Sequence, residues 1–310
     1  MSSRATTLLL LIFFFSSSAE SVFAESTFTV QAGVESATVN LYCRIKTSGR
    51  TYSTTGSGVF VHESGIILTN AHVAQYFLLA TSTGRTKTRC SVREGSPARE
   101  RYSASLIYLS PGWAHTIVEA TTKKQPTKGT GESDFALLRV SAGGKGRLPE
   151  RFPVLPLDLA TATLYDGEQV TAAGYPAEGL TFRGVQKNLK FVAATSTITS
   201  TQSFERPNKD ILALSDSPAS ATGVSGGPIV RSWGGLIGIA VTLKEGASTK
   251  DERSLRAITL SYIDRVLRTE TGRSIFNYIA DTTSNSVDPT TSPFSDLRET
   301  IERTLRNTRR

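Results

Sequence analysis

Short apolar segments separated by turn residues dominate the chain between about residues 28 and 260. They are rich in Val, Ile, Thr and aromatic residues and are bounded by Gly, Pro, Ser or Asp, a pattern typical of β-strands. Since no long segment with helical periodicity interrupts them, we predict an all-β sandwich or barrel rather than alternating strands and helices. The predicted strands are 39–46, 58–62, 66–69, 136–140, 170–174, 191–199, 211–214, 228–230, 236–242 and 257–260, with a hairpin turn at 63–65. We find no internal sequence repeat.

Two segments near the C-terminus show helical periodicity instead. The apolar positions are Ile263, Val266 and Leu267 in residues 261–269, and Leu297, Ile301 and Leu305 in the final segment. Between them, residues 282–292 are rich in Thr, Ser, Asn and Pro and are predicted to be a linker. We interpret the final helix as one that docks on the domain surface, with binding to a partner or a membrane as the alternative.

The N-terminus has the layout of a secretory signal. Arg4 precedes an unbroken apolar run, Leu8–Phe15, and Val22-Phe23-Ala24 then places small residues where signal peptidases cut. We predict cleavage after Ala24, with Ala19 as the second choice, and a secreted or periplasmic protein. Because the run is shorter than the roughly 20 residues that span a bilayer, an uncleaved anchor extended through Phe23 is the alternative. No other stretch approaches the length of a membrane span.

Composition narrows the class of protein. The 310 residues are 38% hydrophobic and 20% charged, which excludes a disordered chain, a coiled coil and a collagen-like chain. Two cysteines and three scattered histidines exclude a zinc-finger array, so we expect no metal and no cofactor. The net charge of +8 favours weak attraction to anionic surfaces, but no nucleic-acid motif accompanies it and we expect no nucleic-acid partner.

The two cysteines are candidates for one disulfide. Export to an oxidising compartment permits a bond between Cys43 and Cys90. Two buried free thiols are the alternative.

Three short segments carry residues suited to nucleophilic catalysis. They are 56–73, which contains His72; 133–138, which contains Asp134; and 223–228, which contains Ser225. A serine hydroxyl attacks efficiently only when a neutral imidazole takes its proton, and a buried carboxylate holds that imidazole in the correct tautomer. The glycines around Ser225 let the backbone turn sharply, so that the N–H groups of Gly223 and Ser225 point together at a developing oxyanion.

Chain order separates two classes of serine hydrolase. Residues 223–227 fit G-x-S-x-G, the nucleophile elbow of α/β-hydrolases, but those enzymes place the histidine after the serine. Here His62, His72 and His115 all precede Ser225, which excludes that class. The order His, Asp, Ser is that of proteases built from two β-barrels.

On these motifs the chain resembles the trypsin-like peptidase family, and in detail its HtrA branch, over roughly residues 35–265. The resemblance implies two perpendicular six-stranded antiparallel β-barrels, with His72 and Asp134 on the first, Ser225 on the second and the site between them. Residues 1–24 would then be a signal peptide, 25–270 the protease domain, and 271–310 the linker with the C-terminal helix.

Two departures limit what the resemblance implies. Val224 replaces the aspartate that precedes the serine in zymogen-activated relatives, so activation through a buried N-terminal ion pair is not expected. Too few residues follow Ile263 for the PDZ domain that HtrA proteins usually carry.

The resemblance also indicates the substrate. The residue six positions before the serine, which helps to set the primary pocket in this family, is the uncharged Ala219, so we expect cleavage after small or medium apolar residues. The strand that contains Ile239 and Val241 is expected to pair with an extended substrate backbone. The leading hypothesis is an exported serine endopeptidase that acts on unfolded or damaged polypeptides. The oligomeric state stays open between a monomer and a homo-oligomer. The alternative function is a protease-like binding module without turnover.

Overall fold

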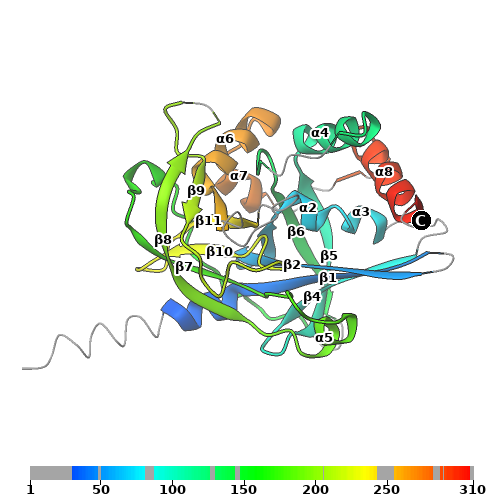
Figure 1. Cartoon of the computed structure of the whole chain (residues 1–310), viewed down its shortest axis with the longest axis horizontal. Helices are drawn as coiled ribbons and strands as arrows, with labels where there is room; N and C mark the ends of the chain where they lie inside the picture. Colours follow the sequence, from blue (N-terminus) through cyan, green and yellow to red (C-terminus); the bar gives the residue numbers. More distant parts are fainter. Residues whose placement is uncertain are drawn as a thin grey trace, which may run out of the picture.

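A computed structural model describes residues 30–47, 50–80, 87–125, 130–143, 147–204, 206–242, 255–281, 287–288 and 290–307. In this part of the chain twelve strands close into two six-stranded antiparallel barrels (Figure 1). The predicted all-β fold with two barrels is therefore confirmed. The expected signal peptide lies outside the described residues.

The two barrels have the same strand order. The first runs β1-β2-β3-β6-β5-β4 and the second β7-β8-β9-β12-β11-β10, each closing on its first strand. The topology thus repeats although the sequence shows no repeat. The first barrel contains β1 (Thr38–Lys46), β2 (Thr51–His62), β3 (Ile66–Thr69), β4 (Lys87–Glu94), β5 (Arg99–Leu109) and β6 (Ala136–Gly143). The second contains β7 (Gln169–Gly174), β8 (Val192–Gln202), β9 (Ile211–Leu214), β10 (Pro228–Arg231), β11 (Leu236–Thr242) and β12 (Leu255–Thr259).

Strands at the junction of the barrels are buried on both faces. In β2, Phe60 belongs to the apolar cluster of the first barrel, whereas Val59 and Val61 belong to a cluster that also contains Ile239 and Ile258 of the second barrel. Successive side chains of a strand point to opposite faces, so both faces need apolar residues here. This explains why the central strands read as continuous apolar runs rather than as alternating ones.

Helices cover the ends and one side of the barrels. They are α2 (Ala71–Ala74), α3 (Phe77–Ala80), α4 (Pro111–Thr122), α5 (Phe182–Lys187), α6 (Leu260–Thr271), α7 (Ile275–Ala280) and α8 (Phe294–Asn307), with a short 3-10 helix at Thr161–Thr163 and a helix over residues 30–37. The helix predicted over residues 261–269 corresponds to α6.

The sequence around His115 favours an exposed loop, but the structure places His115 on helix α4. Ser110 caps the helix by accepting a hydrogen bond from the N–H of Trp113, and Pro111 occupies its first turn, where a missing N–H costs nothing. Trp113 and Ala114 are buried while His115 is exposed. Ile117 and Val118 pack against the same cluster at helical spacing from Trp113 and Ala114, so the segment has a short apolar stripe that the sequence analysis did not identify.

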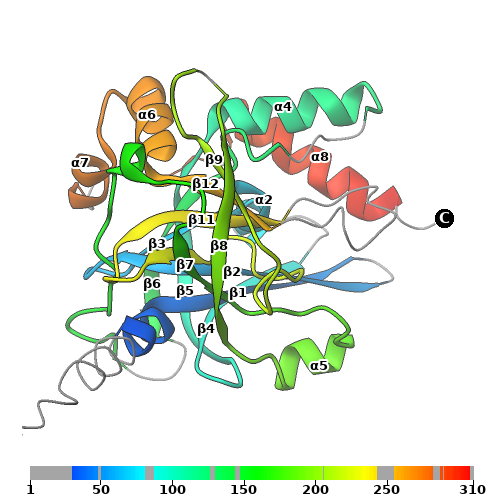
Figure 2. The ribbon, with the colours of Figure 1, turned by 60° about the vertical axis from the view of Figure 1, so that its left-hand side comes forward.

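The C-terminal helix docks on the first barrel. Leu297 and Ile301 are buried in the same cluster as Trp113 of α4, and both views show α8 beside α4 (Figures 1 and 2). Helix α7, which lies beyond residue 270, the predicted end of the protease domain, also packs on the barrels. Its residues Ile275 and Ile279 are buried in the cluster between them. Among the described residues, no helix is both long and apolar enough to cross a membrane.

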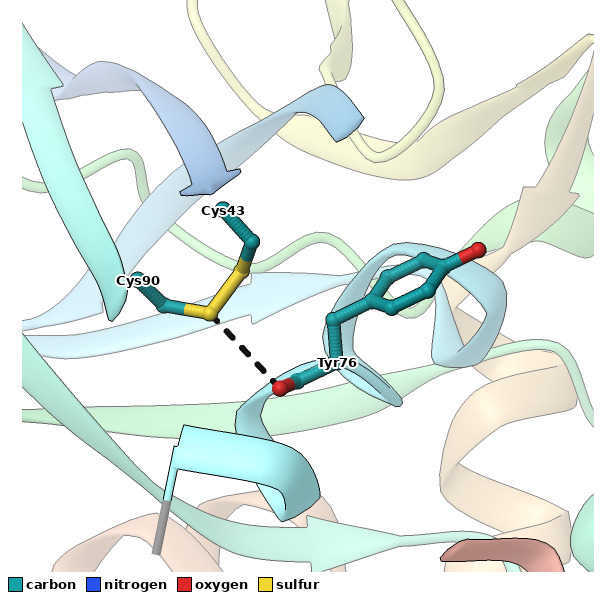
Figure 3. The surroundings of a disulfide bond; sticks show 3 residues. All are labelled: Cys43, Tyr76 and Cys90. Carbon is teal, nitrogen blue, oxygen red and sulfur yellow. Dashed lines mark hydrogen bonds between the residues drawn. A yellow bond between two sulfur atoms is a disulfide. The ribbon is translucent and has the colours of Figure 1, made fainter. Parts of the chain in front are cut away.

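A disulfide joins β1 to β4. Cys43 and Cys90 are direct cross-strand partners, and the bond between them closes a sequence separation of 47 residues (Figure 3). The sulfur of Cys90 lies 3.6 Å from the carbonyl oxygen of Tyr76; a disulfide sulfur carries no proton, so this is a packing contact. The bond therefore packs against the turn that follows α2.

Removing this disulfide is expected to destabilise the fold. Cross-linking a loop of this length stabilises a chain by about 4 kcal/mol when it adds no strain to the folded state. We predict that the double substitution C43S/C90S lowers the free energy of unfolding in urea by about 2–4 kcal/mol. Reductant should destabilise the wild type but not the double variant. Equal stability of the two proteins, or alkylation of both cysteines without reduction, would contradict the prediction.

Candidate active site

A histidine at one end of the first barrel is hydrogen-bonded to an aspartate in the loop that leads into strand β6. Strand β3 ends at Thr69, and the one-turn helix α2 begins at Ala71, so that His72 is its second residue. The Nδ1 atom of His72 lies 2.7 Å from Oδ2 of Asp134, and the backbone N–H of His72 donates to Oδ1 at 2.9 Å. Asn70 donates from Nδ2 to the Asp134 carbonyl oxygen at 2.9 Å. Both carboxylate oxygens of Asp134 are therefore bonded to His72, one to the ring and one to the backbone.

Burial and charge set the state of this pair. Asp134 is buried, with 9% of its side chain exposed, whereas 38% of the His72 side chain remains exposed. Burial lowers the pKa of His72, but the negative charge of Asp134 and its hydrogen bond outweigh that effect, so the pKa lies above its ordinary value. Since Asp134 occupies Nδ1, Nε2 is the ring nitrogen left to exchange a proton with another group.

The loop that carries Ser225 packs directly onto the first barrel. A Cβ atom on Gly226 would lie 2.2 Å from the carbonyl oxygen of Ser57 and 3.1 Å from the backbone nitrogen of Asn70, so only glycine fits. Ser225 itself is 4% exposed, and its carbonyl oxygen accepts a hydrogen bond from the N–H of Ser57 at 2.8 Å. The serine is thus brought to the segment that immediately precedes His72.

Ser57 is a site residue that sequence reasoning did not single out. Its buried hydroxyl donates to the carbonyl oxygen of Gly223 at 2.8 Å and accepts from the N–H of Tyr175 at 2.9 Å. One side chain of β2 therefore holds two segments of the second barrel. The available signal was its place in Gly56-Ser57-Gly58, where small neighbours permit close approach.

The peptide between Thr222 and Gly223 has a defined orientation. The carbonyl oxygen of Thr222 accepts a hydrogen bond from the N–H of Ala177 at 2.7 Å. In a trans peptide the C=O and N–H groups point in opposite directions, so the N–H of Gly223 points away from Ala177. The predicted oxyanion donor is therefore directed away from the loop that follows β7.

The residues expected to contact substrate lie in the second barrel. Ala219 is fully buried among the apolar residues of that barrel. Ile239 lies between Pro228 of β10 and Ile258 of β12, so it has no open backbone edge for a substrate. The register with β10 ends at this residue, whereas Val241 still pairs with Arg256 of β12. The Ala240 backbone also exchanges two hydrogen bonds of 2.8 Å with Gly226 and Gly227 of the Ser225 loop, so of the two expected residues only Val241 is left for pairing with a substrate.

The other two histidines lie outside this site. His62 interacts through Nδ1 with the hydroxyl of Ser64 in the hairpin turn, and His115 is exposed on α4. Within the described ranges, no group of three or more His, Cys, Asp or Glu side chains has an arrangement that could hold a metal ion.

Comparison with known proteins identifies the family. A search of curated proteins gave no significant match. The family model described as a trypsin-like peptidase domain matches residues 56–239, which is more than half of the chain and includes His72, Asp134 and Ser225. The paired barrels have the architecture that this family implies, and the chain belongs to the trypsin-like peptidase family.

Proposed function

We propose that this protein is a serine endopeptidase whose catalytic triad is Ser225, His72 and Asp134. The observation that carries the proposal is the His72–Asp134 pair on the first barrel together with the close packing of the Ser225 loop against Asn70. Membership of a serine peptidase family supports the reaction class.

In this mechanism the Ser225 hydroxyl attacks the substrate carbonyl as Nε2 of His72 takes its proton. The resulting imidazolium is stabilised by Asp134 and returns the proton to the leaving amine, so that the C–N bond breaks and an acyl-enzyme ester remains. Water then attacks the ester with His72 again as base, and the proton returns to Ser225 as the acid product leaves. Atoms and charge balance without a metal or a cofactor.

Backbone donors stabilise the oxyanion of each tetrahedral intermediate. We assign this role to the N–H groups of Gly223 and Ser225, and the orientation of the Thr222–Gly223 peptide supports the assignment. Losing one such donor typically costs about 3–4 kcal/mol of transition-state stabilisation. Ser57 holds the loop through the Gly223 carbonyl.

We further propose that the enzyme is exported and acts on unfolded or damaged polypeptides. The signal-like N-terminus and the Cys43–Cys90 disulfide, which persists in oxidising compartments, support export. The resemblance of the motifs to the HtrA branch supports this substrate class, and Ala219 supports a preference for small or medium apolar residues before the cleaved bond.

Covalent labelling tests the triad directly. We predict that a fluorophosphonate reacts with residues 25–310 at one site, Ser225, as read by mass spectrometry, because only this hydroxyl is activated. Ser225→Ala should abolish the adduct and lower kcat by about 10⁴-fold or more. Absence of an adduct, even with unfolded protein present, would favour the binding module without turnover.

The pH profile tests the His72–Asp134 pair. Catalysis needs neutral His72, and its pKa is raised, so kcat/KM should rise with pH through a midpoint above the ordinary histidine value of about 6.5. Asp134→Asn removes the negative charge, so the midpoint should move to lower pH while kcat falls by about 10⁴-fold. A midpoint that stays in place in this variant would contradict the pairing.

Cleavage specificity tests the role of Ala219. A pocket that contains no carboxylate gains nothing from a cationic side chain and leaves its charge desolvated. In a peptide library we predict faster cleavage after Ala, Val or Leu than after Arg or Lys, by at least about 10-fold in kcat/KM. A preference for Arg or Lys would contradict the assignment.

A further inference from the structure

The loop that presents Asp134 is held by the second barrel as well as the first. Asp134 immediately precedes Phe135 and strand β6, but Gly131 lies against second-barrel side chains. A Cβ atom on Gly131 would lie 3.2 Å from the Ile258 side chain and 3.3 Å from that of Ile211. The position of the loop therefore depends on contacts across the junction.

Ser133, the residue before Asp134, has an unusual backbone conformation. Its φ angle is +53°, in the left-handed region that costs a residue with a Cβ atom conformational energy. Such a conformation persists where surrounding contacts enforce it. The backbone N–H of Ser133 donates to the hydroxyl oxygen of Tyr262 at 3.0 Å, and Tyr262 lies on α6, which follows the second barrel.

Tyr262 is itself held in place. It is 6% exposed, its ring centroid lies 4.9 Å from that of Phe204, and the Arg265 guanidinium lies 5.7 Å from the ring centroid. The hydroxyl therefore occupies a fixed position beside the loop.

The same helix also supports the other side of Asp134. Phe135 stacks on Tyr108 with ring centroids 5.3 Å apart. The Tyr108 hydroxyl donates to Glu270 of α6, and that carboxylate also accepts from the Ser110 hydroxyl at 2.8 Å. Residues on both sides of Asp134 are thus in contact with α6, directly or through one side chain.

We propose that Tyr262 is a positioning residue for the reaction. Its hydroxyl holds Ser133 in the left-handed conformation and so keeps the carboxylate of Asp134 against both the backbone N–H and Nδ1 of His72. Rotation of the Ser133 peptide would displace both of these hydrogen bonds. The proposal rests on the proposed function, in which Asp134 orients and charges the catalytic histidine.

The test compares two tyrosine hydroxyls in similar settings. Tyr262→Phe removes the hydroxyl bonded to Ser133 and retains the ring. Tyr278→Phe is the matched control, because Tyr278 is 8% exposed, belongs to the same apolar cluster, and donates its hydroxyl to the backbone of Ile107 in the first barrel at 2.9 Å. Both variants should melt at similarly lowered temperatures, so general destabilisation is accounted for.

The expected result is a selective change at His72. Tyr262→Phe should lower kcat by about 3- to 10-fold with KM unchanged and shift the acid limb of kcat/KM to lower pH, as expected when one hydrogen bond is lost. Tyr278→Phe should change neither. In the Ser225→Ala background, NMR titration should show a lowered His72 pKa for Tyr262→Phe alone, with His62 and His115 as internal references.

Two results would separate the possible failures. If His72 titrates identically in the Tyr262→Phe, Tyr278→Phe and unsubstituted proteins, the positioning role is wrong even if the enzyme is active. If the unsubstituted enzyme shows no turnover and no labelling, the proposed function is wrong and with it the role in catalysis, whereas a lowered His72 pKa in Tyr262→Phe would still show that Tyr262 positions the His72–Asp134 pair.

Discussion

The apolar contact between the two barrels is the constraint on which the rest of the structure depends. His72 and Asp134 belong to the first barrel and Ser225 to the second, so their separation is set by how the barrels pack. The cluster at this contact includes Val59 and Val61 of β2 as well as Ile239 and Ile258 of β11 and β12. Close-packed interiors resist displacement, so this contact fixes the barrels as rigid supports for the site. Loops alone would not hold the groups with comparable accuracy.

Polar contacts at the junction then refine the position that packing sets. The N–H and hydroxyl of Ser57 bond to Ser225 and Gly223, and Thr69 donates its hydroxyl to the Ser57 carbonyl at 2.7 Å. These groups are buried, so each lost bond leaves an unsatisfied partner. The junction is therefore specific in register as well as apolar, and it combines close packing with a small set of directional bonds.

Local sequence patterns predict the strands and the catalytic motifs, but they do not predict the contacts between distant segments. Short apolar segments and their turns are local patterns, and so are the three motifs around His72, Asp134 and Ser225, which explains why the fold class and candidate site residues could be predicted. Ser57 and Tyr262 act on residues far away in the chain. The small neighbours of Ser57 indicate a close approach but not its partners, and no local pattern marks Tyr262. Helix α4 was not predicted because its apolar stripe, from Trp113 to Val118, spans less than two turns at 3.6 residues per turn. Which residues of β11 are paired on both sides depends on where β10 and the Ser225 loop lie, and no local pattern gives those positions.

The site is supported mainly by hydroxyls and backbone amides rather than by charged side chains, and electrostatics explains why. A cation about 4 Å from Asp134 would interact with it by about 4 kcal/mol at an effective dielectric constant of 20, equivalent to about three pH units. That interaction would compete with the imidazolium for the carboxylate and weaken the base. Neutral groups such as the amide of Asn70 and the hydroxyl of Tyr262 fix the acid loop and leave the carboxylate charge to His72. Arg265 of α6, whose guanidinium lies over the Tyr262 ring, is instead paired with the buried Asp210.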